Sequence, residues 1–279
     1  MCRFLAYSGE PVFLSELVCA PAHSLVHQSL HADEGKTETN GDGFGIGWYG
    51  ERPEPGVYRD ISPAWSDENL VNLCRQVRAR TFFAHVRAAT GTPITRPNCH
   101  PFACGTWLFM HNGYIGDWTR LRRPIEALIP DPLYPSRGGT TDSEAVFLAI
   151  AGAGLVGPDA GRDPIEATAA TLATLTEIVG GPVGGHPFRF TAALANGRDL
   201  YAFRYAVNDA ANSLYYRESE DGVLVVSEPL DREHRNWIAV PDNSVVVARH
   251  DRPAEIVSLR AYGLVRNAPL PRMQVRLSA

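Results

Sequence analysis

The chain has 279 residues, with 31 acidic against 26 basic side chains and a formal net charge of −5 at neutral pH. Its 44% of hydrophobic and 20% of charged residues are typical of a globular protein and exclude a disordered or fibrous one. The mildly acidic balance gives no electrostatic reason to expect a nucleic acid as partner, and we expect none.

The sequence also bears on location and on cofactors. Met1-Cys2-Arg3-Phe4-Leu5 has no basic segment followed by a long apolar run, so we expect no secretory signal peptide and a cytoplasmic protein. The longest uncharged apolar stretch, Val146–Val156, is broken by glycines and is shorter than the ~20 residues that cross a bilayer, so we expect no membrane partner. The five cysteines are irregularly spaced without a C-x-x-C pair, and we expect neither a metal nor a cofactor.

Runs of β-branched and aromatic residues predict strands at residues 4–7, 45–49, 81–88, 106–111, 190–195, 200–205, 213–216, 223–227 and 244–248. Asn196-Gly197 and Asp221-Gly222 predict tight hairpins, because both residue types tolerate positive φ. Every second residue from Gly41 to Gly47 is a glycine. This alternation predicts a bare strand face that backbone or ligand approaches closely.

Helices are predicted at residues 68–78, 118–128, 145–151 and 164–179. Asp163-Pro164-Ile165-Glu166 and Thr141-Asp142-Ser143-Glu144 read as capping boxes at the starts of the last two. Strands gather towards both ends of the chain with helices between them, which predicts an α+β fold of largely antiparallel sheets. No repeat, low-complexity tract or charge block marks a linker, so we expect a single domain over residues 1–279.

Cys2 is chemically unusual because initiator methionine is normally removed ahead of a small residue. The mature chain would then begin with a thiol and a free α-amine on one residue. An α-amine titrates near ~8 and a thiol near ~8.5, so at neutral pH the amine is an adequate base for the sulfur. A cysteine after Met1 is incidental in most chains, so its meaning depends on residues elsewhere.

Two charged residues could bind an amino acid beside such a thiol. In Ala84-His85-Val86-Arg87-Ala88 a strand would place His85 and Arg87 on one face, from which a guanidinium could grip a carboxylate through two hydrogen bonds. Taken alone, Arg87 is more readily interpreted as a solvated surface cation. Asp142 in the first turn of a helix stabilises the helix dipole, and it could also receive an ammonium.

Asn112-Gly113 follows the predicted strand at residues 106–111 and would ordinarily form a hairpin turn. The continuation Tyr114-Ile115-Gly116 is too short and glycine-interrupted for a convincing return strand. The Asn112 side-chain amide and the Gly113 N–H would instead form a two-donor oxyanion hole, worth ~3 kcal/mol per donor towards a tetrahedral intermediate.

The ordered set of motifs resembles the class II glutamine amidotransferases of the N-terminal nucleophile superfamily. The motifs are C-R-F-L from Cys2, P-A-H-S from Pro21, N-G-D-G-F-G from Asn40, P-A-W from Pro63, A-H-V-R-A from Ala84, N-C-H-P-F from Asn98, H-N-G from His111, T-D-S-E from Thr141, S-E-P-L from Ser227 and A-V-P from Ala239. The resemblance covers nearly the whole chain. It is closest to the branch that includes a yeast glutathione-degrading subunit and a bacterial γ-glutamyl hydrolase of ergothioneine biosynthesis.

The resemblance implies a four-layer α/β/β/α sandwich of two mainly antiparallel sheets, with the nucleophile at the start of a central strand. It also implies roles for seven residues: Cys2 as nucleophile, Asn112 and Gly113 as oxyanion donors, Arg87 on the substrate carboxylate, Asp142 on its ammonium, and His100 and Thr90 in the glutamine pocket. The expected reaction is cleavage of a γ-glutamyl amide through a Cys2 thioester.

Several alternatives remain open at this stage. A glutaminase subunit would deliver ammonia to a separate synthase, and a peptidase-like partner subunit is also conceivable. A non-catalytic γ-glutamyl-binding subunit would keep the pocket without turnover. The bile-acid and penicillin amidase branch also begins with cysteine but lacks the amino-acid clamp. Finally, His23, His27 and His31 would align as metal ligands on a helix, although Pro21 and the polar run after them argue against one.

Overall fold

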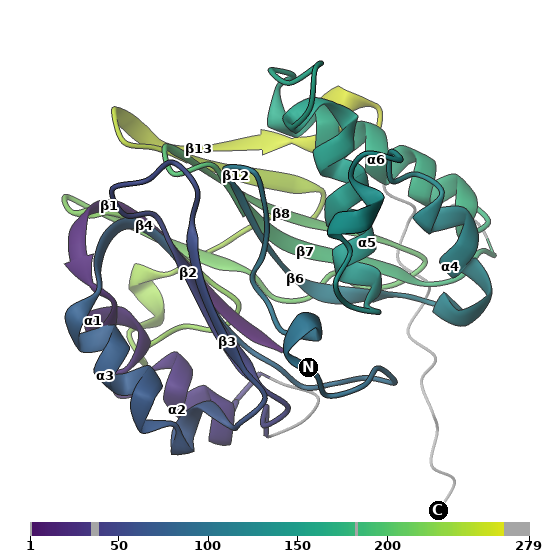
Figure 1. The fold of residues 1–279 in the computed structure, drawn as a ribbon. Coiled ribbons are helices and arrows are strands. Elements are labelled where there is room, and N and C mark those ends of the chain that lie inside the picture. Colours follow the sequence, from purple (N-terminus) through teal and green to yellow (C-terminus); the bar gives the residue numbers. More distant parts are fainter. Residues whose placement is uncertain (1, 35–38, 182–183, 265–279) are drawn as a thin grey trace, which may run out of the picture.

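The computed structural model describes residues 2–34, 39–181 and 184–264. Two antiparallel sheets face each other, one of seven strands in the order β11-β9-β10-β1-β4-β2-β3 and one of six in the order β13-β12-β8-β7-β6-β5 (Figure 1). We call them the first and the second sheet. Their arrangement with the helices confirms the predicted α+β class.

The first sheet consists of β1 (Arg3–Phe13), β2 (Phe44–Trp48), β3 (Gly56–Asp60), β4 (Arg78–Val86), β9 (Tyr215–Ser219), β10 (Gly222–Val226) and β11 (Ile238–Ala239). The second consists of β5 (Phe102–Cys104), β6 (Trp107–Ile115), β7 (Phe188–Ala195), β8 (Asp199–Val207), β12 (Ser244–Arg249) and β13 (Arg252–Ser258). The helices are α1 (Leu14–Val18), α2 (Leu25–Leu30), α3 (Glu68–Gln76), α4 (Trp118–Glu126), α5 (Asp142–Ile150) and α6 (Pro164–Ile178).

Three apolar layers hold the fold together, because each central strand buries both of its faces. On β1, Leu5 packs towards α1, α2 and α3, whereas Phe4 and Ala6 pack towards the second sheet. The second sheet is covered on its other side by α4, α5 and α6 (Figure 1). The order is therefore helix, sheet, sheet, helix, which is the four-layer sandwich that the resemblance implies.

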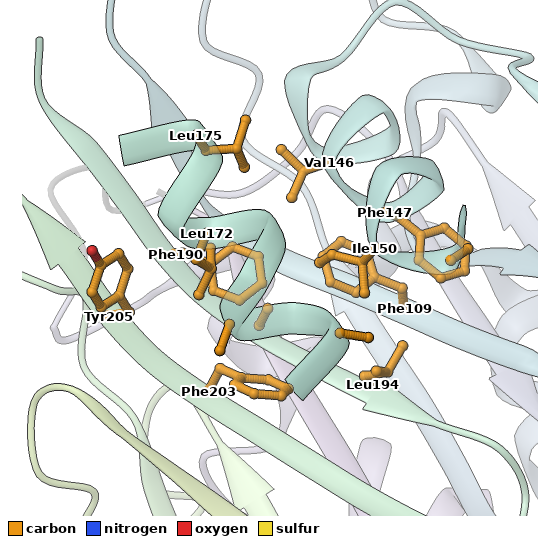
Figure 2. Close-up of a cluster of buried hydrophobic side chains, with 14 of the residues drawn as sticks. Phe109, Val146, Phe147, Ile150, Leu172, Leu175, Phe190, Leu194, Phe203 and Tyr205 are labelled. Atoms are coloured by element: carbon orange, nitrogen blue, oxygen red, sulfur yellow. The ribbon is translucent and has the colours of Figure 1, made fainter. Parts of the chain in front are cut away.

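The layer between the second sheet and its helices contains more than half of the buried aromatic side chains within the described ranges, several of which are drawn in Figure 2. Phe109 of β6 stacks on Phe147 of α5 with ring centroids 5.0 Å apart and planes 1° from parallel. Burying one such side chain stabilises a fold by about 1.5–3 kcal/mol. This packing fixes α5 against β6, and with it Asp142 in the first turn of α5.

Most predicted elements are confirmed to within a few residues. Sequence reasoning missed the short elements β3, β5, β11, β13, α1 and α2. The strand predicted at residues 213–216 lies at Tyr215–Ser219 instead. The hairpins at Asn196-Gly197 and Asp221-Gly222 join β7 to β8 and β9 to β10, and both glycines have positive φ.

The glycine face predicted for residues 41–47 is confirmed at Gly45 and Gly47 on β2, where the His100-Pro101 segment lies against it. It does not extend to Gly41 and Gly43, which precede the strand, and Gly43 has a φ of 109°. A Cβ on Gly45 would lie 2.1 Å from the carbonyl oxygen of His100. A Cβ on Gly47 would lie 2.7 Å from a ring carbon of Pro101. The absence of side chains on this face of β2 therefore lets the segment that carries His100 lie directly against the first sheet.

Two local predictions were wrong. Strand β6 does not end at His111 but runs through Asn112 and Gly113 to Ile115, paired with β7 along its whole length. The Thr141 side chain caps α5 at the Glu144 N–H, but Glu144 does not return to the cap. Its carboxylate accepts hydrogen bonds from the N–H groups of Gly138 and Gly139 at 2.9 and 2.7 Å, because that loop folds over the helix start.

None of the helices in the described part of the chain is long and apolar enough to cross a membrane.

Strands β10, β12 and β13 come from residues beyond 217. The first of these belongs to the first sheet, and the other two belong to the second. Residues 218–264 are thus integrated with the rest of the fold.

Candidate active site

Cys2 stands at the entrance of the strand that occupies the centre of the first sheet. Strand β1 pairs with β10 on one side and β4 on the other, and Arg3 lies opposite Val86. Continuing this register by one residue brings Cys2 opposite Arg87. Because side chains alternate along strands, Cys2 and Arg87 both point between the sheets, on the face that carries Phe4 and Phe83.

The Cys2 sulfur contacts the loop that follows β4. The N–H of Ala88 donates to Sγ at 3.3 Å, and Sγ lies 3.5 Å from the Ala88 carbonyl oxygen. Burial raises the pKa of the Cys2 thiol, although the Ala88 N–H and the positive charges of Arg87 and Arg3 oppose this rise. A thiol in this state needs a nearby base before it becomes a nucleophile.

A buried ion pair anchors the start of β1. Arg3 Nε donates to Glu228 Oε2 at 2.7 Å, with side chains 1% and 2% exposed, and Arg3 Nη1 donates to the Cys2 carbonyl at 3.2 Å. Glu228 also binds His23 Nε2 at 2.5 Å and accepts the N–H groups of Asp33 and Glu34. Burial raises the pKa of Glu228, but His23, Arg3 and these N–H groups outweigh it and lower the pKa to about 2.

A cavity of about 400 Å³ opens beside Cys2. Six of the seven predicted site residues line it: Cys2, Arg87, Thr90, His100, Gly113 and Asp142. Asn112 lies just behind the wall, 1% exposed, with Nδ2 donating to the Cys2 carbonyl at 2.8 Å. Since Nδ2 carries two hydrogens, this bond leaves one of them for a ligand.

Arg87 and Asp142 face this cavity without ion-pair partners among the residues that the structure describes. The Arg87 guanidinium is 3% exposed and donates to Thr92 Oγ1 at 2.7 Å and to the Asp42 and Pro93 carbonyls. Asp142 accepts only from the N–H groups of Ile115 and Ser143, both at 2.8 Å, and weakly from the Ser143 hydroxyl. Arg87 is buried and Asp142 is half-buried. A charge removed from water without a partner is costly, so this arrangement is suited to a ligand with both an anionic and a cationic group.

His111 contacts Ser143, the residue that follows Asp142 at the start of α5. Its Nε2 lies 3.0 Å from the Arg189 carbonyl oxygen, which only accepts, so Nε2 carries the hydrogen and Nδ1 accepts from the Ser143 hydroxyl at 2.9 Å. Burial lowers the pKa of His111, and this effect outweighs the Asp142 charge and the bond to the Arg189 carbonyl, which raise it. Gly113 is required beside it, because a Cβ there would lie 2.1 Å from the Arg189 oxygen and 2.2 Å from His111 Nε2.

Two more histidines pack against each other at the cavity, which His100 lines. The ring centroids of His85 and His100 are 4.3 Å apart, and both residues are buried. Burial, with a smaller effect of the Arg87 charge, lowers the pKa of His85 to about 3, and burial also lowers that of His100. Both rings are therefore neutral at physiological pH.

Sequence reasoning missed Thr92, Ser143 and Asp42 at this site. Thr92 binds the guanidinium of Arg87, and the Asp42 carboxylate accepts the Ala89 N–H at 2.7 Å, which ties the N-G-D-G-F-G motif to the loop against Cys2. Ser143 was visible only as part of a capping motif. No sequence signal linked these residues to Cys2. Asp42 and Ser143 act through contacts with residues far along the chain, and Thr92 through the fold of the loop that it shares with Arg87.

The histidine row does not converge on a metal. His27 lies on the short helix α2, and neighbouring rings of His23, His27 and His31 are 5.4 and 6.0 Å apart. Among the described residues, the group with metal-ligand spacing is His23, Asp33 and Glu228. The Glu228 carboxylate already binds His23, Arg3 and two N–H groups. We therefore interpret this group as a structural contact that holds chain segments together and not as a metal site.

The helix–sheet–sheet–helix fold with a cysteine at the entrance of a central strand defines an amidohydrolase scaffold of the N-terminal nucleophile type. Residues 1–217 match the family described as glutamine amidotransferases class-II, and the chain belongs to that family. It is therefore an enzyme of this class.

Individual relatives agree with this assignment. The chain is 30% identical to the probable glutamine amidotransferase DUG3 of Saccharomyces cerevisiae, over 89% of this chain and 82% of that protein. It is 30% identical to the gamma-glutamyl-hercynylcysteine sulfoxide hydrolase of Mycolicibacterium smegmatis, over 89% and 96%.

Solved structures share the fold. A glutamine aminotransferase class-II domain protein from Silicibacter pomeroyi superimposes with a TM-score of 0.71 at 34% identity, covering 92% of this chain and 99% of that one. The glutamine phosphoribosylpyrophosphate amidotransferase of B. subtilis superimposes with a TM-score of 0.59 at 12% identity. This chain covers 49% of that enzyme, and the likeness concerns the fold alone.

Proposed function

We propose that this enzyme hydrolyses the γ-glutamyl amide bond of glutamine or of a γ-glutamyl conjugate through a thioester on Cys2. The observation that carries the proposal is the pair of unpaired charges, Arg87 and Asp142, in the cavity that contains the Cys2 thiol. An α-amino acid head group has a carboxylate for Arg87 and an ammonium for Asp142. The names of the yeast and mycobacterial relatives support a γ-glutamyl substrate.

The first half-reaction begins after Met1 has been removed. The α-amine of Cys2 takes the thiol proton, and the sulfur attacks the γ-carbonyl carbon to form the C–S bond. The resulting oxyanion accepts hydrogen bonds from the free N–H of Asn112 Nδ2 and from the Gly113 N–H. The C–N bond then breaks, and the departing amine receives the proton from the Cys2 ammonium.

The second half-reaction reuses the same groups. The α-amine takes a proton from water, the hydroxide oxygen attacks the thioester carbon, and the oxyanion again lies at Asn112 and Gly113. The C–S bond breaks, glutamate leaves, and the thiolate recovers its proton. His100 and Thr90 line the cavity and would shape the glutamyl pocket, and no cofactor enters either step.

Within the proposal, cleavage of a γ-glutamyl conjugate ranks above ammonia delivery. The cavity of about 400 Å³ lies in the range of about 300–1,000 Å³ that holds drug-sized ligands. Glutamine has ten non-hydrogen atoms. If each of them took the roughly 30 Å³ that a molecule of liquid water occupies, glutamine would fill at most about 300 Å³. The cavity is therefore large enough for a γ-substituent larger than the amide of glutamine, which favours a conjugate as substrate.

Arg87→Ala, Asp142→Asn and Cys2→Ala test the assignment with glutamine, a γ-glutamyl dipeptide and an acyl-glycine. Loss of a charge-assisted hydrogen bond costs roughly 1.5–3 kcal/mol, so we expect kcat/KM for the glutamyl substrates to fall about 10- to 150-fold in the two clamp variants. Cys2→Ala should have no turnover. If the protein prefers the acyl-glycine to the glutamyl substrates, and the two clamp variants hydrolyse it as fast as the wild type, the chain belongs to the acyl-amidase branch instead.

A further inference from the structure

His85 and Asn112 contain buried polar atoms without a hydrogen-bond partner of ordinary geometry. Both ring nitrogens of His85 and the Oδ1 atom of Asn112 are in this state, and both residues are 1% exposed. Leaving a buried donor or acceptor unsatisfied costs about 1–3 kcal/mol each. Two complementary unsatisfied groups in one layer of the fold therefore call for an explanation.

The two side chains meet across the gap between the sheets. His85 lies on β4 two residues after Phe83, and Asn112 lies on β6 two residues after Met110. Phe83 and Met110 both belong to the apolar layer between the sheets, so strand alternation turns His85 and Asn112 into the same layer from opposite sides. The Asn112 side chain and the His111 main chain are the hydrogen-bonding neighbours of the His85 ring on β6.

The chemistry of the Asn112 amide decides which end faces His85. Its Nδ2 end is held by the Cys2 carbonyl at 2.8 Å, so Oδ1 is the end left for a donor. A neutral imidazole has one N–H to give. The ring of His85 packs against that of His100, with centroids 4.3 Å apart and planes tilted by 32°, and His100 in turn packs edge-on against Phe102.

We propose that His85 is a positioning residue for the oxyanion site, whose ring N–H donates to Asn112 Oδ1 and keeps the Nδ2 end of the amide directed at Cys2. Without this bond the amide keeps its contact with the Cys2 carbonyl but loses the second one, so the reversed orientation, which presents an oxygen to the developing oxyanion, becomes more populated. The Asn112 amide on the second sheet is thus oriented by the His85 side chain on the first. This inference rests on the proposed function of Asn112.

His85→Phe removes the donor and keeps an aromatic ring in the layer, whereas His85→Asn and His85→Gln keep a neutral N–H donor. Phe83→Leu is the matched control, since Phe83 is buried on the same face of the same strand and has no polar atom. The assays are kcat and KM for a γ-glutamyl dipeptide, inhibition by glutamate γ-semialdehyde, which forms a tetrahedral adduct with a thiol, and inhibition by glutamate, which forms none.

Removal of an oxyanion donor lowers kcat by about 10²–10³, so loss of its orientation in His85→Phe should lower kcat by roughly 10- to 100-fold. KM and glutamate inhibition should stay within about threefold, while the aldehyde binds at least about tenfold more weakly. At least one of His85→Asn and His85→Gln should recover most of the loss. Equal effects on the aldehyde and glutamate, a kcat no lower than in Phe83→Leu, or no recovery by either amide would overturn the proposal.

Failure of the proposed function would be seen separately. If the processed wild-type protein neither cleaves the dipeptide nor binds the aldehyde, the γ-glutamyl assignment falls, whereas the hydrogen bond itself remains measurable by NMR. The side-chain NH2 protons of Asn112 should exchange slowly with solvent in the wild type and at least about tenfold faster in His85→Phe. Equal exchange rates would refute the bond.

Discussion

Glu228→Gln removes one charge from the buried pair that anchors the nucleophile's strand. The amide still fills the site but leaves the Arg3 guanidinium, 1% exposed, without an anion 2.7 Å away. Removing one partner of a buried ion pair costs about 3–5 kcal/mol. At about 2–4 °C per kcal/mol for a chain of this size, the melting temperature should fall by roughly 6–20 °C.

The loss should depend on pH in a direction that the two titrating groups fix. The pKa of Glu228 is lowered to about 2, so its stabilisation is present above its unfolded value of about 4.3 and disappears as the pH falls towards 2. The hydrogen bond to Glu228 raises the pKa of His23, so that contribution is present below about 6.5 and disappears as the pH rises through the folded value. The difference between wild type and variant should therefore be largest between about pH 4.3 and 6.5.

Glu10→Gln is the matched control, measured with the wild type and Glu228→Gln by differential scanning calorimetry across this pH range. Glu10 pairs with Arg80 at 3.0 Å, but their side chains are 63% and 53% exposed. Exposed pairs contribute about 0–1 kcal/mol, so this variant should melt within about 3 °C of wild type. If Glu228→Gln also melts that close to wild type, the anchoring role of the Arg3–Glu228 pair is refuted.

Three further substitutions test separate parts of the account. Asn112→Ala should lower kcat by about 10²–10³ with KM little changed, and steady-state kinetics in which KM changes alone would contradict an oxyanion role. Gly113→Ala should abolish turnover and destabilise the fold, because its Cβ would overlap the Arg189 oxygen at 2.1 Å; normal calorimetry and kinetics would contradict this packing. Asp163→Ala removes the cap that accepts from Ile165 and Glu166 and should cost about 1 kcal/mol in urea unfolding without loss of activity.

Local sequence signals predicted the elements whose causes are local. The Asp163 cap and the Asn196-Gly197 turn act within a few residues, and both elements lie where they were expected. The failure at Asn112-Gly113 has the opposite cause. Pairing with β7 carries β6 straight through a dipeptide that favours a turn, and the close contact with Arg189 admits only glycine at position 113.

The candidate site shows the same division. The ordered motifs pointed to Cys2, Arg87, Asn112, Gly113 and Asp142, and the structure brings them together from both sheets and one helix start. The partners that orient them were not readable. The sequence placed a histidine on the face of Arg87, for example, but the amide that it meets comes from the other sheet, which no local pattern encodes.

Mass spectrometry of the processed protein after reaction with a diazo-ketone analogue of glutamine tests the central claim most directly. The account predicts an intact mass that lacks Met1 and one adduct, mapped by peptide sequencing to Cys2, whose formation excess glutamate slows. Labelling of another cysteine, no labelling of the processed chain, or full activity in protein that retains Met1 would contradict it.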